Sequence, residues 1–194
     1  MPHRSAVVEL LRELGAALAR YGARWYLFGA QASMVWGRPR LSADVDATVE
    51  VPNDDWRGLL SSLQDAGFTL RLAEDVDAFV ARTRVLPLVH QPSRLPLDVV
   101  LAGSGLEEEF LSRVVVIDFE GIEVPVLSPE DLIVTKLLAG RAKDLEDIRG
   151  ILDERLDRLE LERLRSTLRE LERALDRSDL TPLLDAEIAR RRDR

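Results

Sequence analysis

Residues 25–51 read WYLFGAQASMVWGRPRLSADVDATVEV, and this stretch decides the fold. The apolar run Trp25–Phe28 predicts a short buried strand that ends at Gly29. Residues Ala30–Trp36 then predict a short helix, which glycine and proline stop. The second apolar run, Val45–Val51, predicts another strand. A strand, a glycine turn, a helix and a strand in this order indicate an α/β domain.

Two carboxylates, Asp44 and Asp46, lie at the start of the second strand with one apolar residue between them. Side chains alternate along a strand, so both acids point the same way. Two like charges this close repel one another unless a cation sits between them. The pair therefore predicts a site that binds a divalent cation, Mg²⁺, together with the phosphates that this cation carries.

A glycine turn and a third acid complete this candidate site. Gly29 leaves room for a phosphate beside the backbone, and the helix after it offers free N–H donors. Asp98 lies near the start of a later apolar run, Leu97–Leu101. An acid at the end of a strand can also serve only to cap the adjoining loop. Together the three acids suggest a two-metal site, in which Asp44 and Asp46 hold the metal on a nucleoside triphosphate (NTP). Asp98 would help bind a second metal and accept a proton from the attacking hydroxyl.

Composition narrows the class of protein. The chain has 194 residues, 46% of them hydrophobic and 32% charged, which is typical of a soluble globular protein. A formal net charge of −8 argues against broad electrostatic binding to duplex nucleic acid or anionic membranes. The chain has no cysteine, which excludes disulfides and thiolate catalysis, and no apolar stretch long enough to span a membrane. We expect a cytoplasmic protein.

The rest of the chain divides at residue 127. Before it, further elements are predicted at residues 5–21 (helix), 53–66 (helix, with Asn53 as N-cap), 68–72, 85–89 and 97–101 (strands), 106–112 (helix), and 114–119 with 122–126 (a hairpin). From Ser128 onward the pattern is helical, with breaks near Gly140, Asp157 and Ser178-Asp179. We therefore expect an α/β domain at residues 1–127 and a helical C-terminal region at residues 128–194, packed on it.

Three further polar side chains fall near these motifs. Lys136 interrupts an otherwise apolar helix, so it either extends to solvent or faces the site and meets a triphosphate. Arg40 and Ser42 lead into the acid pair, where they either contact phosphate or substrate or belong to a solvated loop. The sequence leaves both questions open.

The motifs resemble those of the DNA-polymerase-β-like nucleotidyltransferase superfamily. Its signature is a hydrophobic residue, Gly and Gly or Ser, then about a dozen residues and an acid-hydrophobic-acid triplet, with a third acid on a later strand. Phe28-Gly29-Ala30, Asp44-Val45-Asp46 and Asp98 match that order. The segment Arg40–Asp46 and the block Leu132–Asp147 look like the versions found in the AbiEii-like branch of small bacterial nucleotidyltransferases.

The resemblance implies a fold and a set of site residues. The fold would be α/β (α+β), a mixed sheet flanked by helices with a helical C-terminal region. Asp44, Asp46 and Asp98 would be the metal ligands and catalytic acids. The nucleotide would be bound by six residues: Gly29, Ala30, Ser33, Arg40, Ser42 and Lys136. The family usually has Gly or Ser where this chain has Ala30, so backbone N–H groups, Gln31 or Ser33 would replace that hydroxyl at the phosphate.

We therefore expect a Mg²⁺-dependent nucleotidyltransferase that moves a nucleoside monophosphate from an NTP to a hydroxyl acceptor and releases pyrophosphate. The acceptor, an RNA end, a protein or a small molecule, is not decided by the sequence. Two alternatives share the fold. One is a binding module of a toxin–antitoxin pair that has lost catalysis, which Ala30 supports. The other is an enzyme that modifies an antibiotic, which the acidic net charge suits. A helical interaction protein with unused surface acids is a third alternative.

Overall fold

The computed structural model describes residues 5–38, 42, 44–103 and 105–193. The chain forms two compact units. The first comprises Met1–Gln31 and Leu41–Leu127, and the second comprises Ala32–Arg40 and Ser128–Arg194. Each unit is described by itself below. No helix in the described part of the chain combines the length and the apolar character that crossing a membrane requires.

The first unit is built on a seven-stranded sheet with the order β3-β4-β5-β2-β1-β7-β6. Strand β1 pairs with β7 and strand β2 pairs with β5 in parallel, whereas the other neighbours are antiparallel. The predicted mixed sheet flanked by helices is therefore confirmed. Its elements are α1 (Ala6–Tyr21), β1 (Arg24–Phe28), the start of α2 (Gly29–Trp36), β2 (Val45–Glu50), α3 (Trp56–Asp65), β3 (Phe68–Leu70), α4 (Val76–Thr83), β4 (Val85–His90), β5 (Pro96–Leu101), α5 (Gly105–Ser112), β6 (Val115–Phe119) and β7 (Ile122–Val126).

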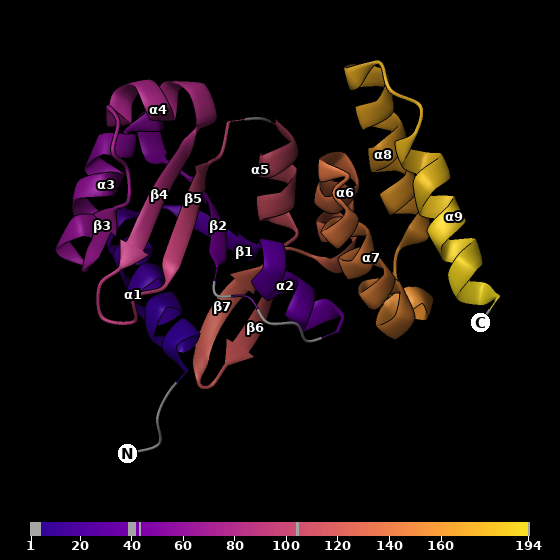
Figure 1. Cartoon of the computed structure of the whole chain (residues 1–194), viewed down its shortest axis with the longest axis horizontal. Helices are drawn as coiled ribbons and strands as arrows, with labels where there is room; N and C mark the ends of the chain where they lie inside the picture. The colour runs from indigo at the N-terminus through magenta and orange to yellow at the C-terminus, as the bar shows by residue number, and fades with distance from the viewer. Residues whose placement is uncertain (1–4, 39–41, 43, 104, 194) are drawn as a thin grey trace. The chain divides into compact units, whose positions relative to one another are not determined.

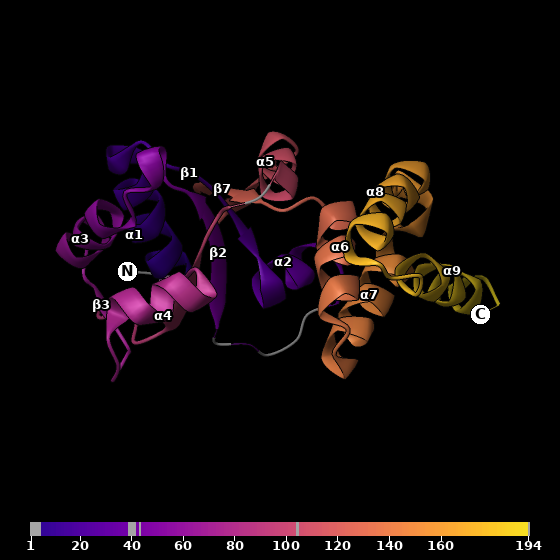
Figure 2. The same ribbon diagram turned by 90° about the horizontal axis from the view of Figure 1, so that it is seen from above.

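Alternation along the strands sorts the sheet into two faces. Helices α1 and α3 pack together over one face (Figures 1 and 2), where fully buried leucines and valines form the core. On the opposite face α5 packs against β1, with the rings of Phe110 and Tyr26 6.4 Å apart in an edge-on arrangement. Asp46 and Asp98 belong to this second face, because their neighbours along the strands are the buried core residues.

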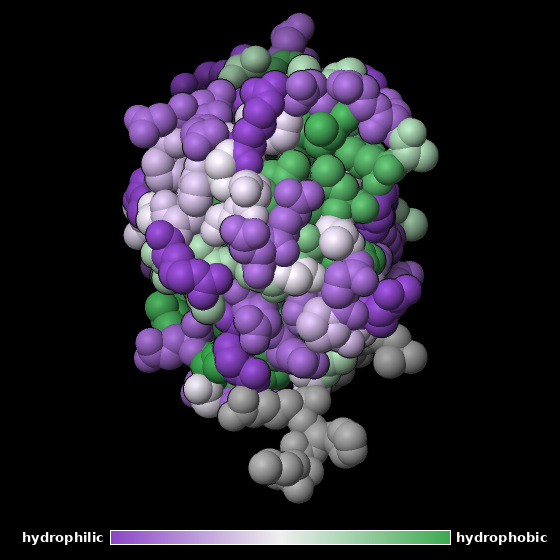
Figure 3. All heavy atoms as spheres, turned by 90° about the vertical axis from the view of Figure 1, so that its left-hand side faces the viewer, coloured by the Kyte–Doolittle hydropathy of each residue, from purple (hydrophilic) through white to green (hydrophobic). Residues whose placement is uncertain are grey.

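The outward sides of the helices are polar. Helix α3 buries only its leucines, Leu59, Leu60 and Leu63, against the core. Figure 3 shows many hydrophilic side chains on one side of the molecule, together with a broad group of hydrophobic ones at its upper right and smaller ones elsewhere. This division of the helix surface is what amphipathic helices on a sheet require.

One predicted helix start is wrong. Asn53 does not cap α3, because Pro52–Asp54 forms a 3₁₀ turn in which Asn53 has a left-handed backbone with a φ of 56°. The helix begins after it, and the carboxylate of Asp55 accepts a hydrogen bond from the backbone N–H of Gly58. Proline and asparagine both favour turns, and the turn prevails over the helix start here.

The second unit is helical, as the pattern after residue 127 predicts. It contains the end of α2, then α6 (Pro129–Ala139), α7 (Ala142–Arg155), η2 (Leu156–Arg158), α8 (Leu161–Leu175) and α9 (Leu180–Arg192). The predicted breaks near Gly140, Asp157 and Ser178-Asp179 all separate helices. The packing of residues 128–194 on residues 1–127 stays a prediction.

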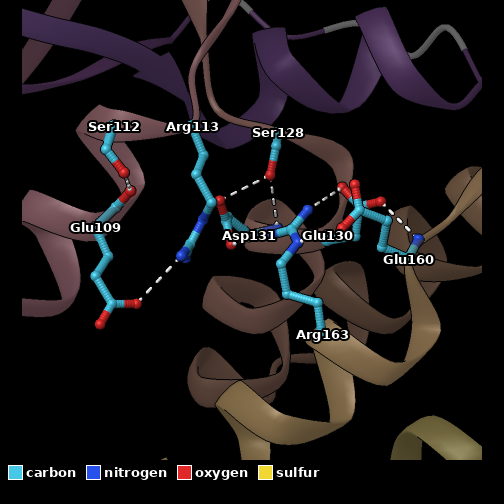
Figure 4. A network of polar contacts seen from close by, with 8 residues as sticks. All are labelled: Glu109, Ser112, Arg113, Ser128, Glu130, Asp131, Glu160 and Arg163. Carbon is cyan, nitrogen blue, oxygen red and sulfur yellow. Dashed lines mark hydrogen bonds and ion pairs between the residues drawn. The ribbon is translucent and has the colours of Figure 1, made fainter.

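Buried acids join α6 to α8 within the second unit. Figure 4 shows the Ser128 hydroxyl, which accepts the backbone N–H of Asp131 and so caps α6. The guanidinium of Arg163 on α8 lies 3.0 Å from a carboxylate oxygen of Glu130 and 3.2 Å from one of Asp131. Both acids are nearly fully buried, so the charge of Arg163 offsets part of the cost of burying them.

Candidate active site

The sheet register brings two of the predicted acids together. Asp46 on β2 is the direct partner of Asp98 on β5, and these two strands run in parallel. Partners in neighbouring strands point to the same face, so the two carboxylates lie side by side. Both residues are half-buried. Asp44 is exposed and precedes the first residue of β2 by one position.

Gly29 lies directly beside this pair. Its φ of +65° is in the left-handed region, and a Cβ added there would lie 2.0 Å from Oδ2 of Asp46. The Asp46 carboxylate therefore occupies the space that a side chain at position 29 would need. Helix α2 begins at Gly29 itself, so the N–H groups of its first turn start at this position.

Three other predicted residues lie around this turn or beyond the described part of the chain. Ala30 is almost fully buried, at 7% exposure. Ser42 is half-buried, and its carbonyl oxygen accepts a hydrogen bond from the Gln31 amide at 3.3 Å. The same amide lies 3.4 Å from the carbonyl oxygen of Asp44. Gln31 therefore holds the backbone that leads into the acid pair. Arg40 lies outside the described residues.

One charged residue of this site, Arg71, is not marked by any of the sequence motifs. Its Nη2 donates a hydrogen bond to Oδ1 of Asp98 at 2.5 Å, and its Nε donates to the carbonyl oxygen of Leu88 at 3.1 Å. Arg71 follows β3 and reaches Asp98 across the intervening strand β4. No local motif marks such a residue, because the contact depends on how the strands pair.

The donor set suits Mg²⁺ in its chemistry. Carboxylate oxygens are the ligands that this hard cation prefers, and Asp46 and Asp98 offer theirs on one face with Asp44 close by in the chain. Within the described residues, no three Asp, Glu or His side chains converge tightly enough to hold a metal ion. Asp98 is engaged by Arg71 instead, so a shared metal would require a change at that contact.

Lys136 and Ser33 meet in the second unit. Lys136 is only 5% exposed, so the alternative in which it extends to solvent is wrong. Its Nζ lies 2.6 Å from Oδ2 of Asp147 and 3.6 Å from Oδ1 of Asp144. The Ser33 hydroxyl donates to the same Asp147 oxygen at 3.3 Å.

The charges of this cluster are closely balanced. Burial by itself raises the pKa of Asp144. The hydrogen bonds and charge of Arg141, together with the charge of Lys136, lower the pKa by more than burial raises it. The pKa of Asp144 therefore ends below its ordinary value, and this carboxyl group is ionised at neutral pH. The predicted role of Lys136 at a triphosphate stays a prediction.

The family model described as "Nucleotidyltransferase of unknown function (DUF6036)" matches residues 6–180. The chain belongs to this nucleotidyltransferase family. Membership agrees with the acid-bearing mixed sheet, and it does not place the chain in the AbiEii-like branch. No curated protein matches the chain.

Solved structures share the fold of this nucleotidyltransferase. The solution structure of the antibiotic-resistance factor ANT(2'')-Ia has a TM-score of 0.57 at 17% identity, covering 90% of this chain and 97% of that one. The crystal structure of ANT(2'')-Ia with adenylyl-2''-tobramycin has a TM-score of 0.57 at 18% identity, covering 88% and 98%. An antigenic nucleotidyltransferase-like protein from Paracoccidioides brasiliensis has a TM-score of 0.52 at 19% identity, covering 93% and 92%. At these identities the likeness shows the fold alone.

Proposed function

We propose that the protein is a Mg²⁺-dependent nucleotidyltransferase that moves a nucleoside monophosphate from an NTP to a hydroxyl acceptor by a two-metal mechanism. The observation that carries the proposal is the direct pairing of Asp46 with Asp98 on one face of the sheet, beside the Gly29 turn. Asp46 and Asp98 are half-buried acids in directly neighbouring positions, and a divalent cation bound between them would offset the cost of holding like charges together.

Each acid has a role in this proposal. Asp44 and Asp46 hold the metal that carries the triphosphate, and Asp98 is the third ligand and the general base. The bound Mg²⁺ ions would neutralise the charge that develops on the phosphate oxygens. Asp98 accepts the proton of the acceptor hydroxyl, whose oxygen forms a bond to the α-phosphorus. The bond from that phosphorus to the pyrophosphate oxygen breaks, and pyrophosphate leaves.

The remaining predicted residues would bind the nucleotide. The backbone N–H groups at the start of α2, from Gly29 and Ala30 onward, suit a phosphate. Ser42 leads into the acid pair with Arg40, and we propose both as phosphate contacts. Ser33 and Lys136 would contribute a hydroxyl and a cation to the triphosphate.

A small-molecule acceptor is the candidate that a specific observation favours. ANT(2'')-Ia, which shares the fold over nearly its whole length, was solved with adenylyl-2''-tobramycin. The net charge of −8 would attract a cationic small molecule. An RNA end or a protein side chain is the alternative acceptor. A binding module that pairs with a toxin or antitoxin is the alternative function, and Ala30 supports it.

The test combines binding with turnover. The protein is incubated with each α-labelled NTP, Mg²⁺ and, in parallel, tobramycin, cell RNA or cell protein, and the labelled product is identified. We expect Asp98→Asn to lower kcat about 100-fold or more through loss of the base. Asp44→Asn should abolish Mg²⁺-dependent NTP binding in calorimetry, whereas the exposed Asp65→Asn, on α3, should change neither quantity.

Three outcomes separate the alternatives. Binding of Mg²⁺–NTP without any labelled product supports the binding module. Unchanged binding and turnover in Asp44→Asn would contradict the proposed site. Absence of any thermal shift with Mg²⁺ and NTP would contradict a nucleotide function altogether.

A further inference from the structure

One row of residues crosses the sheet at the level of the acids. Phe28 on β1 pairs with Asp46, Asp46 with Asp98, and Asp98 with Pro87 on β4. Arg71, the residue that follows β3 in the chain, continues the row, because its backbone N–H donates to the carbonyl oxygen of Pro87 at 3.0 Å. The strand register therefore places a cation at one end of a row that contains two adjacent carboxylates.

Arg71 has two anchors that do not involve an acid. Its backbone N–H is bonded to Pro87, and its Nε is bonded to the Leu88 carbonyl oxygen at 3.1 Å. Only Nη2 reaches Oδ1 of Asp98. The guanidinium would therefore stay next to the acid row even when its contact with Asp98 is given up.

The contact with Asp98 is open to exchange. The Arg71 and Asp98 side chains keep 42% and 37% of their surface exposed. Ion pairs with this much solvent contact contribute little, so a divalent cation competes for the carboxylate on favourable terms. Arg71 places its positive charge beside Asp98, whose direct partner on β2 is a second acid, Asp46. Removing Arg71 would therefore leave less positive charge near two neighbouring carboxylates.

We propose that Arg71 is the resident counter-ion of Asp98 in the metal-free protein, and that a divalent metal binds by taking its place. The proposal rests on the proposed metal site at Asp44, Asp46 and Asp98. It assigns Arg71 a positioning role: the residue keeps the acid pair compatible with the fold when no metal is bound. Metal binding then includes the cost of breaking the Arg71–Asp98 contact.

The first test measures Mn²⁺ binding by paramagnetic resonance on the full chain without nucleotide. Arg71→Met should bind Mn²⁺ about two- to five-fold more tightly than the wild type, because no ion pair has to be broken. Arg71→Lys retains the charge and should stay close to the wild type. Arg82→Met is the control for net charge, because Arg82 also pairs with an exposed acid, Glu74, at 3.3 Å; its Mn²⁺ affinity should not change.

The second test measures thermal stability in chelator and then in Mn²⁺. In chelator, Arg71→Met should melt below the wild type, and added Mn²⁺ should raise its Tm by more than that of the wild type. Adding Asp98→Asn should remove both differences, because the repelling carboxylate is then gone.

The outcomes distinguish the two proposals. If the wild type binds Mn²⁺ and Arg71→Met binds it equally or more weakly, the counter-ion role is wrong and the metal site stands. The counter-ion role is also wrong if Arg71→Met changes the Tm by the same amount in the Asp98→Asn background. If neither protein binds Mn²⁺, the proposed metal site itself is wrong, and the role of Arg71 falls with it.

Discussion

Gly29 meets two separate requirements at the residue scale. Its backbone is left-handed, which costs a residue with a side chain about 1–2 kcal/mol. Its missing side chain also makes room for Oδ2 of Asp46, which would lie 2.0 Å from a Cβ. The glycine therefore determines where the Asp46 carboxylate lies.

Gly29→Ala separates these two requirements when it is compared with Gly22→Ala. Gly22 ends α1 with a φ of +78° and has open space around its Cα, so its replacement costs only the backbone energy. We expect both variants to lose about 1–2 kcal/mol of unfolding free energy in urea for the backbone alone. Only Gly29→Ala should in addition weaken Mn²⁺ binding, because Asp46 has to move. Equal Mn²⁺ affinity in the two variants would contradict this account.

Sequence reasoning at this scale predicted the carboxylates and missed their arginine. The alternation around Asp46 and the strand start near Asp98 are local signals, and the structure brings these two residues together. Arg71 gives no such signal. Its contact depends on the offset between β3 and β4, which the sequence does not reveal.

At the scale of elements, a buried ion pair joins α6 and α7. Lys136 and Asp147 each keep 6% of their side-chain surface exposed, and Oδ1 of Asp144 lies 3.6 Å from the Lys136 Nζ. Removing one charge from such a deeply buried ion pair destabilises the fold, because the opposite charge is then left buried without compensation. The local sequence could not show this, because a lysine in an apolar helix predicts burial and exposure equally well.

Lys136→Met tests whether the lysine serves the fold. We expect a loss of about 3–5 kcal/mol of unfolding free energy, since the buried Asp147 carboxylate loses the ammonium group that lies 2.6 Å away. The double variant Lys136→Met/Asp147→Leu should recover most of that loss, because an apolar pair replaces the ionic one. The exposed Lys143→Met on α7 is the control and should stay within about 0.5 kcal/mol of the wild type.

The measurement also addresses the proposed role of Lys136 at the triphosphate. If Lys136→Met keeps its stability and loses only NTP affinity, the lysine acts at the nucleotide and its structural role is refuted. If the double variant is stable and still binds NTP as the wild type does, the proposed phosphate contact is wrong.

Most elements followed from local patterns, and the exceptions have a physical reason. Periodicity located the helices of the second unit and the β6–β7 hairpin, where Glu120-Gly121 forms the turn. The Pro52-Asn53 segment was wrong because turn and helix-start preferences overlap in these residues. The order of the strands in the sheet could not be predicted, because β2 and β5 pair across about fifty residues of chain.

At the scale of the whole molecule, a buried histidine makes stability depend on pH. His90 is fully buried, its ring is 4.8 Å from that of Phe68, and its Nδ1 is 2.7 Å from the Ser93 hydroxyl. Burial lowers the pKa of His90, and the carboxylates of Glu9 and Glu13 offset this only in part. The folded protein therefore disfavours the protonated ring.

The sign of the pH effect follows from the lowered pKa. The unfolded chain takes up the proton near pH 6.5, whereas the folded chain resists it to lower pH. The contribution of His90 is therefore complete above pH 6.5 and is lost as the pH falls toward the lower, folded value. We expect the urea unfolding free energy of the wild type to fall between pH 7.5 and 5.5.

His90→Phe should flatten this dependence, because the replaced ring cannot take up a proton. His3→Gln removes the only other histidine and should leave the wild-type slope unchanged. A slope that persists in His90→Phe would show that another group carries the effect. Carboxylates with lowered pKa values, such as Glu187 beside Arg149, lose their contribution at lower pH and do not obscure this range.

The row that joins Arg71 to Asp98 also has an evolutionary consequence. Position 71 follows β3 and position 98 lies on β5, which is not a neighbour of β3 in the sheet, yet the two residues share one ion pair. A relative that replaces the acid at position 98 has no use for a cation at position 71, and one that loses the cation is left with an uncompensated acid. We therefore expect these two positions to covary among homologous chains, and relatives that have lost both charges to be the ones that no longer bind a metal there.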